Sequence, residues 1–239
     1  LVPYLNLHAK ETVSHLLDRI TLPADAATKE RREDVAKAFR YLLSLVRYKH
    51  AAEVRDELAR QGQPLLQRTL EAARSTTERQ VAAQLRYQGV ALVHGLCKLK
   101  PDWLPSCPDV LQALVQIWSS QERLAAEGQA AMPLEQVREF KVIAKCFVSC
   151  LRHQAKALGD EIGDGHIELL FLMLSIFSHH TLVAYDFLKL FYLEEVATGY
   201  SVAQRVACLR YFLRFFQSSR TARADRVQAL QLIALPMLC

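Results

Sequence analysis

One pattern runs through the whole chain: apolar residues return every three or four positions, and no segment alternates as a β-strand does. The breaks fall at clusters of Gly, Pro and Ser that lie about one helical hairpin apart, which is typical of stacked helical repeats. Eight Gly and eight Pro in 239 residues are too few to form the turns that many short strands would require. The sequence therefore predicts an all-α fold.

The predicted hairpins are spaced by about 40 residues, in the range of HEAT and armadillo units. We expect a HEAT/armadillo-like helical repeat solenoid of about four to five hairpins over residues 1–239. The chain begins without Met or a basic leader and stops within an apolar run, so we interpret it as a segment truncated at both ends. The approximate hairpins are 28–73, 75–118, 134–177 and 182–216, with a last helix at 224–239.

Local signals indicate where the helices begin. Thr28 precedes a charged first turn, and Ser75–Glu78 has the spacing of a capping box. Ser201 is expected to cap the helix that starts at Val202, and Pro108 suits the first turn of another.

Other signals indicate where the helices break. Gly62 and Pro64 predict a bend or break between about His50 and Ala73, and Pro236 would bend the last helix. Three prolines make residues 100–108 a connector. Residues 119–131 fit either a polar loop or an extension of the helix before them.

The residues contain little that could perform catalysis or bind a metal. No phosphate-binding loop, metalloprotease, hydrolase or kinase motif is present, so we expect neither an enzyme nor a cofactor. Cys146, Cys150 and His153 share one helix face but lack a fourth ligand, so we expect packing there. Residues 159–165 resemble a calcium loop only superficially, and a helix stop fits them better. His179–His180 is expected to cap a helix or face solvent.

The longest apolar run, residues 169–177, is too short to cross a bilayer, which takes about 20 residues. We expect a helix that is buried on most sides.

The charge is uneven. Residues 201–239 hold six Arg against Asp225, a net charge of +5, while the other 200 residues carry 24 basic and 24 acidic groups. Arg pairs with carboxylate or phosphate through a bidentate fork, so these residues could meet an acidic peptide or a nucleic acid. A solvated face or a contact with a further repeat is the simpler explanation of these residues. The candidate partner-binding basic ridge is Arg210, Arg214, Arg220, Arg223 and Arg226.

Several stretches resemble the TRRAP/Tra family of very large transcription coadaptors. The first is Pro101–Pro108, followed by Leu111–Leu114 and Trp118. The others are Phe187–Phe191 with Tyr200–Ser201, Arg205–Phe216 and Gln228–Leu238, so the resemblance spans most of the chain.

The resemblance implies a segment of the HEAT arm in a member of the PI3-kinase-related group, whose kinase-like head has lost its catalytic residues. It implies a nuclear scaffold that recruits histone acetyltransferase complexes of the SAGA type to activators. Transcription activators and coactivator-complex subunits would be the partners. No membrane and no direct nucleic-acid contact is expected, and the chain would continue into further repeats. No catalytic or cofactor-binding residue maps onto this segment.

Two other classes stay open. The chain could be the HEAT arm of a catalytically active PI3-kinase-related kinase, which the rest of the full-length sequence would decide. It could also be another HEAT scaffold such as a nuclear transport receptor, although such a receptor should present acidic inner surfaces to basic cargo. The neutral-to-basic charge argues against that class.

Overall fold

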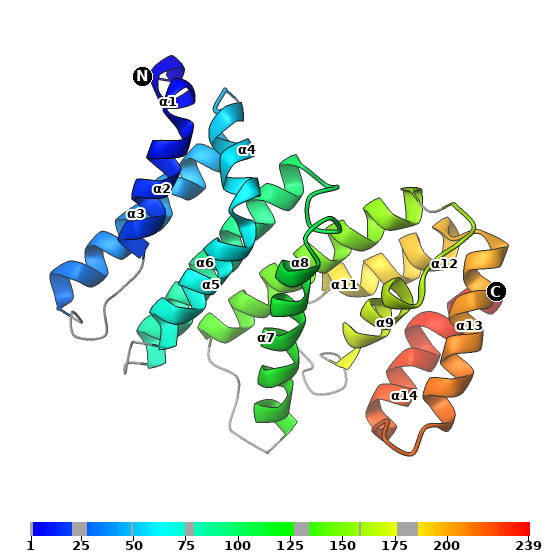
Figure 1. Cartoon of the computed structure of the whole chain (residues 1–239). Helices are drawn as coiled ribbons and strands as arrows, with labels where there is room; N and C mark the ends of the chain where they lie inside the picture. Colours follow the sequence, from blue (N-terminus) through cyan, green and yellow to red (C-terminus); the bar gives the residue numbers. More distant parts are fainter. Residues whose placement is uncertain are drawn as a thin grey trace. The chain divides into compact units, whose positions relative to one another are not determined.

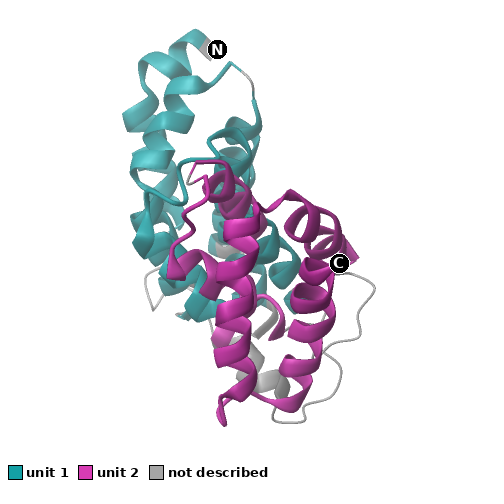
Figure 2. Cartoon of the chain, turned by 90° about the vertical axis from the view of Figure 1, so that its right-hand side faces the viewer, with its two compact units in different colours: residues 1–118, 132–146 teal, residues 119–131, 147–239 magenta. Residues whose placement is uncertain are grey.

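A computed structural model describes residues 2–20, 28–48, 50–74, 79–126, 134–157, 159–175 and 186–239 (Figure 1). All regular structure in these ranges is helical, which confirms the all-α prediction. The chain divides into two compact units, residues 1–118 with 132–146 and residues 119–131 with 147–239 (Figure 2).

Unit 1 is built from helices that pack side by side. Helix α6 packs against both α3 and α5, and α2 packs against α3 and α4. The helices that contribute to it are α1 (Val2–Leu7), α2 (Ala9–Ile20), α3 (Lys29–Arg47), α4 (Ala52–Arg60), α5 (Gly62–Arg74), α6 (Arg79–Leu99), the first part of α7 (Pro108–Ala126) and the first part of α8 (Leu134–Ala157).

Unit 2 holds the end of α8 and the C-terminal helices. Its helices α13 and α14 run antiparallel through a short loop (Figure 1). The elements are α9 (Asp164–Leu172), α11 (Asp186–Leu190), the π-helical turn η2 (Phe191–Val196), α12 (Ala197–Gly199), α13 (Val202–Gln217), α14 (Arg223–Ala229), the π-helical turn η3 (Leu230–Ala234) and α15 (Leu235–Leu238).

The predicted break between α4 and α5 is confirmed, and it falls at Gln61. A helix end leaves carbonyls without intrahelical donors. The indole of Trp103, from the turn at residues 101–106, donates from Nε1 to the Ala59 carbonyl at 2.7 Å. The same ring lies against Gly62, where a Cβ atom would overlap it. Trp103 therefore fills the break.

Helices α5 and α6 approach closely at Gly89 of α6. Its position faces the buried side chain of Thr69, whose hydroxyl donates to the Leu65 carbonyl at 2.8 Å. A Cβ atom at Gly89 would overlap that side chain. The absence of a side chain at this position lets the two helices pack together.

We expect Gly89→Ala to destabilise unit 1. Alanine gains about 1 kcal/mol in helix propensity, but overpacking costs about 1–3 kcal/mol, so the expected net loss is about 1 kcal/mol. Gly165→Ala in α9 is the control, because nothing lies within 4 Å of its added Cβ. Thermal unfolding followed by circular dichroism measures both. A variant Gly89→Ala that is as stable as Gly165→Ala would contradict the close approach.

The local start signals are confirmed wherever the structure describes them. The Thr28 hydroxyl accepts from the Arg31 amide at 3.3 Å. Ser201 and Gln204 form a reciprocal capping box, with distances of 3.3 and 3.0 Å. Ser75–Glu78 and His179–His180 lie outside the described residues.

The other boundaries are mostly as predicted. Helix α7 begins at Pro108, after a turn at residues 101–106. It continues to Ala126, so the predicted helical extension is confirmed for residues 119–126, and residues 127–131 lie outside the described residues. The backbone widens into η3 just before Pro236. Because Pro lacks an N–H and crowds the carbonyl four residues earlier, this wider turn accommodates the ring.

Candidate interaction surface

The basic ridge lies on the hairpin of α13 and α14. Arg210 and Arg214 are exposed and stand one turn apart on α13. Arg220 is exposed in the loop that follows, and Arg223 is exposed at the first position of α14. The structure therefore gathers these four guanidinium groups on one helical hairpin.

Arg226 has a different role from the other members of the ridge. Its side chain is half-buried, and its guanidinium donates to the Ser218 carbonyl at 2.9 Å and to the Thr221 carbonyl at 2.9 and 3.1 Å. These bonds satisfy carbonyls of the loop between α13 and α14. Arg226 therefore stabilises the loop between α13 and α14, which carries Arg220.

One member of the ridge contacts an aromatic ring. The guanidinium of Arg214 lies 5.6 Å from the ring centroid of Tyr211, within the range of a cation–π contact. Burial raises the pKa of Tyr211, and the charges of Glu168 and Asp164 raise it further, while Arg214 lowers it. The contact with Tyr211 lies within α13, and Arg214 stays exposed at the surface.

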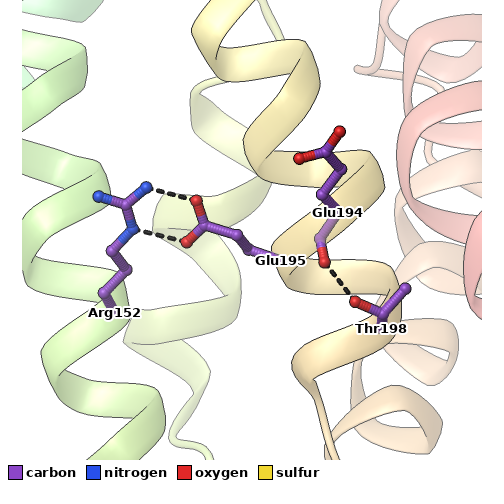
Figure 3. Close-up of polar contacts among 4 residues, drawn as sticks. All are labelled: Arg152, Glu194, Glu195 and Thr198. Carbon is purple, nitrogen blue, oxygen red and sulfur yellow. Dashed lines mark hydrogen bonds and ion pairs between the residues drawn. The ribbon is translucent and has the colours of Figure 1, made fainter.

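A bidentate ion pair ties α8 to η2 within unit 2 (Figure 3). The Arg152 Nε atom donates to Glu195 Oε2 at 2.6 Å, and its Nη2 atom donates to Oε1. The hydrogen bond with Glu195 raises the pKa of Arg152, and the guanidinium also lies 5.9 Å from the Phe191 ring. Beside it, the Thr198 hydroxyl donates to the Glu194 carbonyl where η2 passes into α12.

His166 lies in the core of unit 2 with polar partners on both ring nitrogens. Its Nε2 atom is 2.6 Å from the Tyr200 hydroxyl, and its Nδ1 atom is 3.2 Å from the side-chain oxygen of Gln154. Burial lowers the pKa of His166 to about 4 and raises the pKa of Tyr200. Both groups are therefore neutral at pH 7, and their burial makes them part of the core rather than a site open to a substrate.

The predicted packing role of the cysteines of α8 agrees with their burial. Cys146 and Cys150 are fully buried, whereas His153 is partly exposed. Within the described ranges, no three His, Cys, Asp or Glu side chains come together in a way that could hold a metal ion. Gly159 has a φ of 56° just beyond α8, a conformation that favours glycine after a helix, so the helix-stop interpretation is confirmed.

In the part of the chain that the structure describes, no helix combines the length and the apolar character that crossing a membrane requires.

Sequence comparison relates the chain to known proteins. The family model for the Tra1 HEAT repeat ring region matches residues 1–239. The probable transcription-associated protein 1 of Dictyostelium discoideum is 26% identical over 160 residues, which is 66% of this chain and 3% of that protein. The transformation/transcription domain-associated protein of Homo sapiens is 26% identical over 226 residues, 90% of this chain and 5% of that protein. The protein of that name from Mus musculus is also 26% identical over 226 residues, 8% of its length. No solved structure matches the chain.

Proposed function

Because the chain belongs to the family of the Tra1 HEAT repeat ring region, a HEAT-type all-α repeat fold, we propose that it is a non-catalytic scaffold segment of a large transcription coactivator. In this proposal the parent protein works in the nucleus and recruits histone acetyltransferase complexes of the SAGA type to activators. Its own kinase-like head would be inactive. The segment contributes contacts with other proteins and turns over no substrate.

The observation that carries the proposal is the family match along the whole chain, together with relatives that are named as transcription-associated proteins. The chain spans only 3–8% of the length of the curated relatives, so the function belongs to a much larger protein.

The chemistry of the core supports a structural role. The strongly shifted groups are buried: burial raises the pKa of Cys208 to about 12 and raises the pKa of Tyr192, whose hydroxyl donates to the Leu170 carbonyl. Such groups keep their neutral forms at pH 7. They stabilise a frame and are poorly placed to act as nucleophiles.

The local part of the proposal concerns the basic ridge. Four exposed guanidinium groups on one hairpin can each grip a carboxylate, so the ridge suits acidic segments of transcription activators. Subunits of the coactivator complex would contact other helix faces. Binding at the ridge would add affinity and faster association without any chemical step.

We expect an acidic activator peptide to bind the chain about tenfold more weakly after charge reversal of the ridge, a change of about 1.4 kcal/mol. Arg226 is left intact because it holds the loop. Fluorescence anisotropy of a labelled peptide at physiological salt gives the dissociation constant. The substitutions are Arg210→Glu, Arg214→Glu, Arg220→Glu and Arg223→Glu.

A matched control reverses four exposed cations of unit 1 and has the same net charge: Arg19→Glu, Arg40→Glu, Arg47→Glu and Lys98→Glu. The control variant should keep most of the affinity. Equal losses of affinity in the two variants would mean that peptide binding depends on the net charge alone. Unchanged affinity in the ridge variant would exclude the ridge as the binding site.

A further inference from the structure

Three helices of unit 1 bring basic side chains together that are far apart in the sequence. Residues 1–200 carry 24 basic and 24 acidic groups, so charge counting alone predicts no basic surface among them. In the structure, Arg47 on α3, Lys98 on α6 and Lys145 on α8 are exposed, and His94 on α6 is half-buried. We call these four residues the α3–α6–α8 cluster.

Helices α3 and α6 meet directly beside two members of the cluster. A Cβ atom added to Gly95 would lie 3.0 Å from Cγ1 of Val46. His94 precedes Gly95 and Arg47 follows Val46, so this contact places the imidazole and the guanidinium at the same level of the two helices. Lys98 stands one turn after His94, on the same side of α6.

Helix α8 lies on the other side of α6. Arg86 donates from Nε to Oε1 of the fully buried Glu139 at 3.1 Å. Counting about 100° per residue, Arg86 and Gly95 point to opposite sides of α6. The two helices run in the same direction (Figure 1). His94 lies eight residues after Arg86 and Lys145 six after Glu139, so at 1.5 Å per residue they differ in level by only about 3 Å.

The cluster lies on the outer side of these helices. Gly89 of α6 faces Thr69 of α5. Counting about 100° per residue, His94 and Lys98 stand about 140° and 180° around α6 from Gly89. Both therefore lie on the side of α6 that is turned away from α5, where a partner can reach them.

The electrostatics of His94 show that the charges of the cluster act at one place. Burial lowers the pKa of His94, and the charges of Lys145, Lys98 and Arg47 lower it further. The imidazole is therefore neutral at pH 7 and retains one N–H donor. Three cations that act on one group also repel one another, and an anion bound among them would relieve this repulsion.

We propose that the α3–α6–α8 cluster binds the phosphate group of a phosphorylated serine or threonine in a partner protein. A phosphate monoester carries a charge of about −1.5 to −2 at pH 7 and three acceptor oxygens, so it can meet several donors at once. A carboxylate offers one charge and two oxygens. A nucleic-acid backbone spreads single charges along a strand, and a long basic stripe fits it better than one compact cluster.

Lysine acylation in the full-length parent protein tests the proposal. An N-hydroxysuccinimide ester modifies exposed Lys side chains, and mass spectrometry of the digested protein gives the rate at each one. An acetylated peptide with one phosphoserine, at about 1 mM, should slow the reaction of Lys98 and Lys145 at least about threefold, which corresponds to a dissociation constant of about 0.5 mM. Lys10 and Lys189, exposed on α2 and α11, should keep their rates.

Three comparison ligands decide the chemistry of the partner. The unphosphorylated peptide, and the peptide with Glu in place of phosphoserine, should each protect the two lysines less than about 1.5-fold. Equal protection by the Glu peptide, or no protection by the phosphopeptide, would overturn the proposal. Stronger protection by a single-stranded DNA oligonucleotide at the same phosphate concentration would overturn it too, in favour of nucleic acid.

A substitution that leaves both reporter lysines in place tests the geometry. Arg47→Ala should raise the dissociation constant of the phosphopeptide at least about fivefold, because it removes a charge-assisted hydrogen bond. Arg19→Ala, at an exposed position of α2, is the matched control and should leave the protection unchanged. Equal protection in the two variants would contradict a site that includes α3.

The proposal does not depend on the function proposed for the basic ridge. The four charge reversals in the ridge should leave the protection of Lys98 and Lys145 intact. The matched control of the ridge experiment contains Arg47→Glu and Lys98→Glu, so it should lose phosphopeptide protection at Lys145 while it keeps the acidic peptide. Either proposal can therefore fail alone.

Discussion

Truncation of Trp118 to Ala is expected to lower the free energy of unfolding of unit 1 by about 3–5 kcal/mol. Trp118 belongs to α7, is fully buried, and is among the largest buried side chains of the described structure. Its ring packs edge-on against Phe140 of α8, with centroids 5.0 Å apart and an interplanar angle of 88°. The substitution removes this contact and leaves a cavity that close-packed helices can fill only in part.

The second tryptophan supplies the measurement. The chain has two Trp, and both lie in unit 1, so in the variant the fluorescence of Trp103 alone reports the unfolding of that unit in denaturant. Trp118→Phe should keep more than half of the lost stability, because an aromatic ring remains against Phe140. Tyr41→Ala, at a side chain that is 63% exposed, should change stability by less than about 0.5 kcal/mol. A loss below about 1 kcal/mol for Trp118→Ala would contradict the packing.

Acidification is expected to weaken unit 2 through His166. Burial lowers the folded-state pKa to about 4 from the ordinary value of 6.5, so the unfolded state binds the proton more tightly. The contribution of His166 to stability is complete above pH 6.5 and is lost as the pH falls toward 4. At pH 4.5 the expected loss from this group is about 2.5 kcal/mol.

Comparison with His166→Gln isolates this effect, because glutamine can keep one hydrogen bond to Tyr200 but does not titrate. The quantity to measure is the change in stability between pH 7 and pH 4.5 for each protein, from hydrogen exchange of unit 2 amides corrected for intrinsic rates. The wild type should lose about 2.5 kcal/mol more than the variant. Parallel losses in the two proteins would show that His166 is already protonated or exposed in the folded state.

Features that depend on neighbouring residues in the sequence could be predicted. Ser201, with Gln204 three residues later, specifies a capping box through contacts within one turn. Gly62 and Pro64 specify the break between α4 and α5 because both disfavour a helix interior. Pro108 starts α7 for a related reason, since the first helical position needs no N–H donor.

Features that depend on distant residues could not be predicted. Trp103 fills the α4–α5 break from a turn more than 40 residues away, and no local pattern connects it with Ala59. The bond between His166 and Tyr200 joins residues 34 positions apart. Helix α1, of six residues, is absent from the predicted helices because it contains less than two turns of periodicity. The hairpin boundaries proposed from spacing stay a prediction.

The basic ridge could be predicted only in part from the sequence. Counting charges identified the arginines of residues 201–239, but only the contacts separate Arg226, which bonds two loop carbonyls, from the exposed members of the ridge. The exposed apolar residues Val202, Val206, Leu213 and Phe216 of α13 could not be predicted to be exposed, for a different reason. Apolar residues at intervals of three and four indicate a packed side of a helix, and a single sequence does not show whether the packing partner is near or far in the chain.

The π-helical turns η2 and η3 have an evolutionary consequence. A π turn joins each N–H to the carbonyl five residues back, so it takes up about one residue more than an α-helical turn of the same path. A relative with regular α-helices here would be one residue shorter in each segment. Alignments should then place single-residue gaps inside residues 191–196 and 230–234. If an alignment placed these gaps in a loop instead, the residues of the helices between them would be shifted by one position. The wrong side of each of these helices would then be taken as the buried side.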